Sequence, residues 1–452
     1  MAPDSHAGAD EALLVEPIEG PLDATVVLPG SKSITNRALV CAALAGGESR
    51  LLGPLEADDT MAMVEGLHAL GVSVERERAG RTDGSPDGSI WLVAGCDGRP
   101  PSEVAIVDAR LSGTTSRFLM PVASLGLGVT RVDGALPLRA RPMGPSIHAL
   151  RELGVTVVEA GAPGHLPVDL SEGPAAGGAV DVAGDASSQF LSGLLLAGPA
   201  MRTGLTLRVE GPLVSAPYVE MTAAVMAAFG VEVARPDATT WRVAPQTYRG
   251  TRYRIEPDAS AASYAFAAAA IVGGRVRVEG LSPASLQGDV AFVDLLERMG
   301  AEVERTATAI TVAGTGGLRG IEADLSQISD TAQTLAAVAT FAEGPTRATG
   351  IGFIRHKETD RIGNVVAELR RAGIRADEEA DGFVVHPGAA QPATVETYHD
   401  HRMAMSFALL GLRRPGIRIS DPGCVGKTFP GFWAMLQALR EGGGSPGRVL
   451  PS

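Results

Sequence analysis

Two kinds of predicted helix alternate along this chain, and the alternation recurs at a spacing of roughly 70 to 80 residues. The first kind is amphipathic and ends at a glycine, and most copies are followed by a strand rich in Val and Ile. An internal repeat constrains the fold because each copy has to bury its apolar face against its neighbours. The copies of the amphipathic helix fall at residues 59–71, 143–154, 216–230, 288–300, 359–373 and 430–443.

The second kind of predicted helix begins with polar residues and continues with small apolar residues on every side. A helix that is apolar all round is a buried helix. Its copies lie at residues 31–47, 112–126, 187–200, 260–274, 329–344 and 401–412. Short strands flank both kinds, so the alternation predicts six βα-rich units, most simply three in each of two domains.

The composition is that of a protein with a large folded core. The 452 residues are 45% hydrophobic, which favours two domains or one domain built by repetition. The formal net charge of −13 argues against nucleic acid or an anionic membrane as a partner. Three cysteines without a CxxC pair, and a start without signal- or transit-peptide features, predict a reducing cytoplasm. No apolar run is long enough to span a membrane, and residues 1–12 and 441–452 are predicted to be flexible ends.

Lysine occurs at only three positions, Lys32, Lys357 and Lys427, whereas the other 36 basic residues are arginine. All three lysines lie in short polar motifs, LPGSKSITNR, RHKETDR and GKTFP. A lysine ammonium is compact, rotatable and able to titrate, and a planar guanidinium is none of these. The distribution therefore predicts three functional sites for lysine.

The first turns of the predicted buried helices are rich in Ser, Thr, Asp and Gln. Any one such start is good capping chemistry and needs no further explanation. Several, however, also carry a cation, an amide or an imidazole: Lys32, Arg37, Arg117, Gln189, His401 and Arg402. Because helix N-termini hold partial positive charge and free N–H groups, several of them together predict a site for a strongly anionic substrate.

Seven motifs make the chain recognisable. They are LPGSKSITNRALV, SGTTSR, ASSQFLSGLLLA, SAPYVE, HKETDR, DHRMAMSFAL and DPGCVGKTFPGFW, in this order over some 400 residues. Together they resemble the EPSP synthases (3-phosphoshikimate 1-carboxyvinyltransferases) of the enolpyruvyl transferase family. The resemblance implies an α/β fold of two similar domains, each of three βαβαββ units with buried helices, an inside-out α/β barrel. It also implies interleaved lobes, one of residues 30–247 and one of residues 13–29 plus 248–440.

The activity implied by the resemblance is transfer of the enolpyruvyl group of phosphoenolpyruvate to the 5-hydroxyl of shikimate 3-phosphate, with release of phosphate. The family needs neither metal nor organic cofactor, and we expect a monomer whose only partners are these two small molecules. The residues matched to shikimate 3-phosphate are Lys32, Ser33, Arg37, Ser187, Ser188, Gln189, Ser215, Tyr218, Asp330 and Lys357. Those matched to phosphoenolpyruvate are Lys32, Gly113, Thr114, Arg141, Gln189, Arg361, Arg402 and Lys427.

The chain departs from the family pattern at two positions. Leu111 and Phe353 stand where relatives often have Asn, so contacts from an amide there are not expected. The sequence also places Asp330 at the start of a buried helix, where it would serve as an N-cap. Lys357 and Arg361 are four residues apart, a spacing that is repulsive on a bare helix and makes sense if bound anions lie between them; a conventional surface helix start is the alternative.

The mechanism implied is addition followed by elimination. Asp330 is expected to take the proton of the 5-hydroxyl, and Glu358 or Lys32 to protonate C3 of phosphoenolpyruvate. Proton transfer to carbon needs an acid whose pKa is tuned by its surroundings. We expect an open state without substrates and a closed complex with both.

Three other functions compete with this interpretation. The paralogous transferase that acts on UDP-N-acetylglucosamine usually carries a reactive cysteine on a loop, and Cys96 lies in a predicted loop. A kinase is suggested by Gly426-Lys427-Thr428, but a P-loop needs glycine where this chain has Asp421. A binding protein of the same fold without catalysis is disfavoured because Asp330 and Glu358 are both present.

Overall fold

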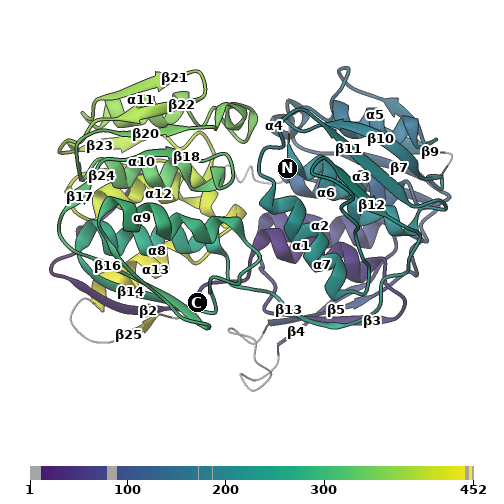
Figure 1. The fold of residues 1–452 in the computed structure, drawn as a ribbon, viewed down its shortest axis with the longest axis horizontal. Helices are drawn as coiled ribbons and strands as arrows, with labels where there is room; N and C mark the ends of the chain where they lie inside the picture. Colours follow the sequence, from purple (N-terminus) through teal and green to yellow (C-terminus); the bar gives the residue numbers. More distant parts are fainter. Residues whose placement is uncertain (1–11, 79–88, 172, 186, 443–446, 450–452) are drawn as a thin grey trace, which may run out of the picture.

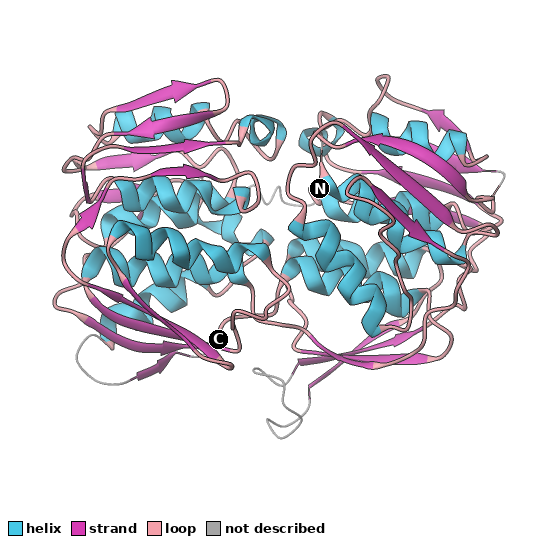
Figure 2. Ribbon diagram, in the orientation of Figure 1, coloured by secondary structure: helices cyan, strands magenta, loops and turns pink. Residues whose placement is uncertain are grey.

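The computed structural model describes residues 12–78, 89–171, 173–185, 187–442 and 447–449. The chain forms two halves that lie side by side (Figure 1). In each half the helices lie inside and the sheets lie outside, as Figure 2 shows. The fold is therefore the mixed α/β architecture expected from the repeat.

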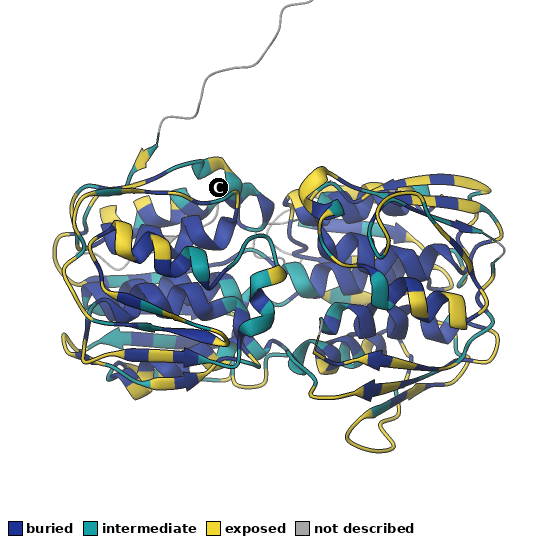
Figure 3. Ribbon diagram, turned by 90° about the horizontal axis from the view of Figure 1, so that it is seen from above, coloured by how far each residue is buried: buried dark blue, intermediate teal, exposed yellow. Residues whose placement is uncertain are grey.

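Each half has a centre of buried helices, which correspond to the predicted helices that are apolar all round. Their residues are almost entirely inaccessible, as the dark interior in Figure 3 shows. The helices are α1 (Lys32–Ala43), α3 (Gly113–Ala123), α6 (Ser188–Ala197), α8 (Ala259–Val272), α10 (Ala332–Ala339) and α12 (His401–Gly411). Small side chains such as those of the alanine run in α8 let these helices approach one another closely.

The amphipathic helices pack around the buried ones with their apolar faces inward. They are α2 (Asp58–Ala69), α5 (Gly144–Glu152), α7 (Pro217–Ala228), α9 (Phe292–Met299), α11 (Gly363–Arg371) and α13 (Phe432–Glu441). The predicted terminal glycines Gly71, Gly154, Gly230, Gly300 and Gly373 all have positive φ, between 76° and 113°. Glycine adopts this conformation without steric cost, which is why the pattern predicted these helix ends correctly.

Three sheets cover the buried helices of the first half. Their strand orders are β13-β3-β5-β4, β6-β7-β9-β8 and β10-β11-β12. The strands are β3 (Glu48–Leu52), β4 (Val74–Arg78), β5 (Ser89–Ala94), β6 (Val104–Asp108), β7 (Val129–Asp133), β8 (Thr156–Glu159), β9 (Val168–Ser171), β10 (Gly178–Ala183), β11 (Leu205–Glu210), β12 (Thr240–Val243) and β13 (Arg252–Arg254).

The sheets of the second half include strands from both ends of the chain. The orders are β15-β16-β14-β2-β25, β18-β20-β22-β21, β1-β24-β23 and the pair β17-β19. The strands are β1 (Leu13–Leu14), β2 (Leu22–Val26), β14 (Gly274–Glu279), β15 (Glu302–Arg305), β16 (Ala309–Gly314), β17 (Leu318–Arg319), β18 (Glu322–Asp324), β19 (Ala342–Glu343), β20 (Thr346–Thr349), β21 (Ala376–Glu379), β22 (Gly382–Val385), β23 (Ala393–Val395), β24 (Ile417–Ile419) and β25 (Gly447–Val449).

The two halves have separate hydrophobic cores. One core runs from Ile34 to Ile255, and the other joins Val15–Leu28 to residues 259–439. We therefore call residues 30–255 the N-terminal half, and residues 13–29 with 256–442 and 447–449 the C-terminal half. In Figure 1 the purple strand β2 lies beside β14, with which it pairs in parallel. Strand β13 pairs with β3, so the N-terminal half extends past the boundary expected at residue 247.

The chain crosses between the halves twice, and the two crossing segments lie side by side. Gly30 and Pro257 form an antiparallel bridge, and the Asp258 N–H donates to the Pro29 carbonyl at 2.9 Å. The two carboxylate oxygens of Asp258 accept from the Ala261 N–H and from the Lys32 N–H, at 2.8 and 3.0 Å. One side chain therefore caps α8 and also holds the start of α1.

Three local expectations were wrong. Helix α11 begins at Gly363 rather than at residue 359, because the Asp360 side chain accepts from the Ile362 and Gly363 N–H groups and ends a non-helical turn there. Helix α10 begins at Ala332, after a 3-10 turn (η4, Ser329–Thr331) that contains Asp330. Part of the predicted flexible tail, β25, instead pairs with β2; residues 1–11, 443–446 and 450–452 lie outside the described part. No described helix is long and apolar enough to cross a membrane.

Candidate active site

A cavity of about 560 Å³ lies between the two halves, at the starts of the buried helices. Its walls come from α1, α3 and α6 of the N-terminal half and from η4 and α12 of the C-terminal half. Of the residues singled out in the sequence, those that line it are Lys32, Ser33, Arg37, Thr114, Arg117, Arg141, Ser187, Ser188, Gln189, Ser215, Tyr218, Asp330, Phe353, Lys357, Glu358, Arg361, His401 and Arg402. Gly113 and Lys427 do not line it, but Gly113 lies beside Arg141 and Lys427 Nζ lies 3.9 Å from Glu358. The expected convergence of helix starts is present.

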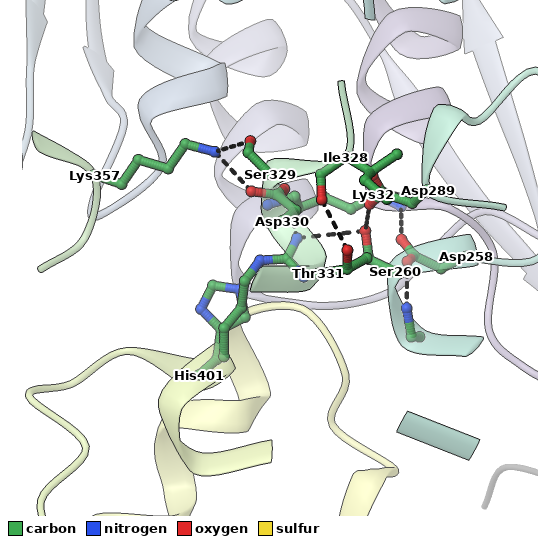
Figure 4. A network of polar contacts seen from close by, with 12 residues as sticks. Lys32, Asp258, Ser260, Asp289, Ile328, Ser329, Asp330, Thr331, Lys357 and His401 are labelled. Carbon is green, nitrogen blue, oxygen red and sulfur yellow. Dashed lines mark hydrogen bonds and ion pairs between the residues drawn. The ribbon is translucent and has the colours of Figure 1, made fainter. Parts of the chain in front are cut away.

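Asp330 is surrounded by cations, and Figure 4 shows one of them, Lys357, beside it. Its Oδ1 lies 2.7 Å from Lys357 Nζ and 3.3 Å from an Arg361 guanidinium nitrogen, and its Oδ2 lies 2.7 Å from an Arg402 nitrogen. Burial acts to raise the pKa of Asp330, but the charges of Arg402, Lys357 and Arg361 outweigh it and hold the pKa well below its usual range. The side chain makes no helix cap, so the N-cap interpretation of Asp330 was wrong.

Glu358 is the second carboxylate of the cavity. Its Oε2 lies 2.8 Å from an Arg361 nitrogen, and its Oε1 lies 3.6 Å from Arg141 and 3.9 Å from Lys427 Nζ. Burial acts to raise the pKa of Glu358, but Arg361, Arg141 and Lys427 together hold it well below its usual range. Arg141 belongs to the N-terminal half and Lys427 to the C-terminal half, so Glu358 is bound by cations from both sides.

Asp59 joins two of the three lysines of the chain. It is buried in the first turn of α2, and its carboxylate lies 3.3 Å from Lys32 Nζ and 2.9 Å from Lys427 Nζ. Lys427 also donates to the Leu111 carbonyl at 2.9 Å. The ammonium of Lys427 therefore reaches across from the C-terminal half and is held by two groups of the N-terminal half.

Gly113 lets two arginines approach the first turn of α3. A β-carbon at this position would lie 2.8 Å from Arg141 Nη1 and 2.9 Å from Arg117 Nη1, closer than such atoms ordinarily come. Arg117 also donates to Gln189 Oε1 at 2.7 Å, and Gln189 Nε2 donates to Thr114 Oγ1 at 3.1 Å. A larger residue here would therefore have to displace the guanidinium groups of this part of the wall.

Arg37 lies deeper than its expected role suggests. It is 2% exposed, and it donates to Thr222 Oγ1 at 2.7 Å, to Ser192 Oγ at 3.2 Å and to the carbonyls of Ser33 and Tyr218 at 2.9 and 3.0 Å. Its guanidinium is therefore engaged by protein groups on all its nitrogens. Only the edge of this residue reaches the cavity wall.

The serine residues occupy the N-terminal side of the cavity. Ser187 is the N-cap of α6, and its Oγ accepts from the Gln189 N–H at 3.3 Å, so capping and a place at the cavity coexist. Ser215 has φ of 54°, and its N–H donates to the Ser326 carbonyl of the other half at 3.1 Å. Tyr218, in the first turn of α7, places its hydroxyl 3.4 Å from Asp330 Oδ2.

Leu111 and Phe353, the two departures from the family pattern, each contact a lysine of the site. Leu111 is 42% exposed and contributes its backbone carbonyl, which Lys427 binds. The Phe353 ring lies 5.6 Å from Lys357 Nζ, within the range of a cation–π contact. Lys357 and Arg361 lie in the turn between η5 (Gly352–His356) and α11, so the expected helical spacing of this pair was wrong. They are close because both bind Asp330.

Sequence reasoning did not single out Asp59 or Asp400. Asp400 is the N-cap of α12 and accepts from the Arg402 N–H at 2.9 Å, while its two oxygens also bind Arg361 at 2.7 and 3.1 Å. An aspartate at a helix start carries an ordinary capping signal, so the second role leaves no mark in the sequence. The described His, Cys, Asp and Glu residues do not gather in groups of three that could hold a metal ion.

Comparison with known proteins gives one consistent result. The pattern of the EPSP synthase (3-phosphoshikimate 1-carboxyvinyltransferase) family matches residues 17–436. The 3-phosphoshikimate 1-carboxyvinyltransferase of Nostoc sp. is 42% identical over 424 residues, 94% of this chain and 98% of the relative. The protein of that name from Methanosphaerula palustris is 44% identical over 423 residues, 93% of this chain and 97% of the relative.

Solved structures agree with the sequences. An EPSP synthase from Acinetobacter baumannii superposes with a TM-score of 0.78 at 26% identity, covering 95% of this chain and 97% of that one. Cys96, which the UDP-N-acetylglucosamine alternative would need at the site, packs against the core of the N-terminal half, and burial raises the pKa of its thiol. By its sequence, its fold and the cavity between its halves, the chain belongs to the EPSP synthase family.

Proposed function

We propose that this chain transfers the enolpyruvyl group of phosphoenolpyruvate to the 5-hydroxyl of shikimate 3-phosphate and releases phosphate. The observation that carries the proposal is an ionised carboxylate, Asp330, held among three cations in the wall of a cavity between the halves. Two anionic substrates need cations to bind, and the attacking hydroxyl needs a base. The chain offers both within one cavity.

Shikimate 3-phosphate lies toward the N-terminal half in this proposal. The hydroxyl groups of Ser187, Ser188 and Ser215 and the N–H groups at the start of α6 bind its phosphate, together with Lys357. Arg37 supports the Tyr218 carbonyl and the start of α1 rather than supplying most of the charge. Asp330 and Tyr218 then face the ring hydroxyls.

Phosphoenolpyruvate lies between Arg141, Arg361, Arg402 and Lys427, beside the first turn of α3 at Gly113. These cations are paired with Glu358, Asp330 and Asp59. The phosphate and carboxylate of the substrate compete with the protein carboxylates for the same cations. Binding therefore exchanges internal ion pairs for pairs with the substrate, which keeps the buried charges balanced.

The addition step begins at Asp330. This carboxylate takes the proton of the 5-hydroxyl while the oxygen forms a bond to C2 of phosphoenolpyruvate, and a proton is added to C3 to give a methyl group. The tetrahedral intermediate then loses a proton from C3 and the C–O bond to phosphate breaks. Cations around the phosphate stabilise the charge that develops on the leaving group.

Glu358 and Lys32 are the two candidates for the acid at C3. Glu358 is ionised beside Arg361, Arg141 and Lys427. When phosphoenolpyruvate binds those cations, the pKa of Glu358 rises toward a value at which the carboxyl can hold and donate a proton. Lys32 is compact and able to titrate, which an arginine in its place is not.

The halves close around the substrates in this proposal, because Lys427, Asp59 and Glu358 bring groups of both halves together. The enzyme acts as a monomer in this proposal. It works in the cytoplasm, where its three free cysteines stay reduced. The lobes that move are the N-terminal half, residues 30–255, and the C-terminal half, with the hinge at the two crossing segments near Gly30 and Pro257.

One assay tests the proposal. The purified chain is mixed with phosphoenolpyruvate and shikimate 3-phosphate in metal-free buffer, and phosphate release and the enolpyruvyl ether are measured together. Both should appear in equal amounts. Turnover with UDP-N-acetylglucosamine in place of shikimate 3-phosphate, or no phosphate with either, would refute it.

A further inference from the structure

Asp289 is a buried carboxylate beside the cavity that the proposed reaction does not use. It lies in the 3-10 helix η3 (Gly288–Ala291) and is 3% exposed. Its Oδ2 accepts from Ser260 Oγ and, at 3.4 Å, from the Tyr218 hydroxyl, while its Oδ1 is without a partner among the described residues. Both donors are neutral hydroxyl groups. A buried carboxylate held only by hydroxyls is costly to ionise.

Tyr218 connects this carboxylate to the base. Its hydroxyl lies 3.4 Å from Oδ2 of Asp289 and 3.4 Å from Oδ2 of Asp330. A phenol has a single proton to donate, so it cannot donate to both carboxylates at once. It can bridge both only if one of them is protonated and donates to the phenol oxygen. The two carboxylates therefore share a site for one additional proton.

The charges around the two carboxylates determine whether Asp330 or Asp289 holds that proton. Asp330 is in contact with Lys357, Arg361 and Arg402, whereas Arg402 reaches Asp289 only through Ser260, at 3.5 Å from its Oγ.

Five charged or polar groups face Asp289: Asp258 and Ser260 at the start of α8, Tyr218 on α7, Asp330 in η4 and Arg402 on α12. Burial and the negative charge of Asp330 raise the pKa of Asp289 to about 6, and Arg402 opposes the rise.

We propose that Tyr218 and Asp289 form a proton relay. The relay removes from Asp330 the proton that this carboxylate has taken from the attacking hydroxyl. The inference rests on the proposed role of Asp330 as that base. The Asp330 carboxyl donates its proton to the Tyr218 oxygen while Tyr218 donates its own proton to the Asp289 carboxylate. One O–H bond breaks and one forms on the tyrosine, so Tyr218 is unchanged, Asp330 is again an anion and Asp289 is neutral. Solvent water takes the proton from Asp289 between turnovers.

The relay disfavours reversal of the addition step. Once the proton has moved to Asp289, Asp330 cannot return it to the ether oxygen, so reversal of the addition is slowed. Asp330 also regains the negative charge that its three cations require while the intermediate breaks down. Because Asp289 must be ionised to receive the proton, turnover should fall on the acid side as the pH drops through its pKa of about 6.

Steady-state kinetics between about pH 5 and pH 8 test the relay in Asp289→Asn, Tyr218→Phe and the double variant. Each single variant should lower kcat at least about tenfold and lose the acid limb, which a merely structural role would leave in place. The double variant should be no slower than the slower single variant, because the two residues act as one unit. Glu256→Gln is the matched control: it removes a carboxyl that binds the neighbouring Leu286 N–H, and it should keep the limb.

An acid limb that survives in Asp289→Asn, or losses that multiply in the double variant, would overturn the relay. A second measurement does not depend on turnover. Since the raised pKa means that folded Asp289 holds its proton more tightly than the unfolded chain, the wild-type protein should lose thermal stability relative to Asp289→Asn as the pH rises from about 4 to about 7. No relative loss would also overturn the inference. If wild-type protein releases no phosphate, it is the proposed function that fails.

Discussion

Replacing Asp330 by asparagine distinguishes its role as a base from its effect on substrate binding. The amide keeps the size of the side chain but cannot take a proton, so kcat should fall about 10²- to 10⁴-fold, or about 3 to 5 kcal/mol of transition-state stabilisation. Binding should behave in the opposite way. Asp330 lies 2.7 Å from both Lys357 and Arg402, and each contact has a gross electrostatic energy of about 6 kcal/mol at an effective dielectric constant of about 20. In the variant those cations are free to bind the anionic substrates, so neither KM should rise.

The measurement is phosphate release at saturating concentrations of both substrates, with KM determined for each substrate in turn. Asp185→Asn is the control, because Asp185 also lines the cavity but is exposed. Its kcat should change less than about twofold, as for an exposed substitution. A loss of kcat below about tenfold in Asp330→Asn would show that Asp330 is not the base, and a KM that rises would show that the freed cations do not make up for lost contacts to the substrate.

Four further substitutions test other parts of the site. Lys32→Arg keeps the charge beside Asp59 but cannot donate a proton, so kcat should fall about 100-fold with both KM values nearly unchanged; equal losses would make Lys32 a binding group only. Gly113→Ala puts a carbon 2.8 Å from Arg141 Nη1, so the KM for phosphoenolpyruvate should rise about tenfold and that for shikimate 3-phosphate should not; an unchanged KM for both would refute this. Asp59→Asn removes the buried carboxylate that pairs with both Lys32 and Lys427, so urea unfolding should show a loss of about 3 kcal/mol, partly restored by added phosphate; a loss below about 1 kcal/mol would contradict the pairing. Glu358→Gln tests a depressed pKa, whose stabilisation is present above the ordinary value of 4.5 and is lost below it. The difference in Tm between wild type and this variant should therefore shrink as the pH falls from about 5 to about 3, and a constant difference would refute it.

The repeat and the helix types were predictable because they depend on periodicity. A glycine after an amphipathic face and a run of small apolar residues are local signals, and they located the helix centres correctly. Helix starts were less predictable. Asp330 and Asp360 look like ordinary capping residues, yet one binds cations and the other ends a turn before α11. Local propensity does not distinguish a carboxylate that caps a helix from one that faces a cavity.

The recognised residues do lie together, but their ion pairs could not be predicted. Several cations of the cavity are paired with a carboxylate that lies far away in the sequence, such as Lys427 with Asp59. Such pairs result from the packing of the two halves, so no fixed spacing in the sequence predicts them. The strand β2 is a similar case, since its pairing with β14 joins residues about 250 positions apart.

The adjacent crossing segments make the N-terminal half an insertion within the C-terminal half. Residues 29 and 258 are joined by a backbone hydrogen bond, so the ends of the insertion are already in contact. A short turn from Leu28 to Ala259 could replace the whole insertion while leaving β2, β14 and their shared core intact. A single cut at the second crossing, in contrast, would leave β1 and β2 on the N-terminal fragment, although they pair with β24 and β14 of the C-terminal half.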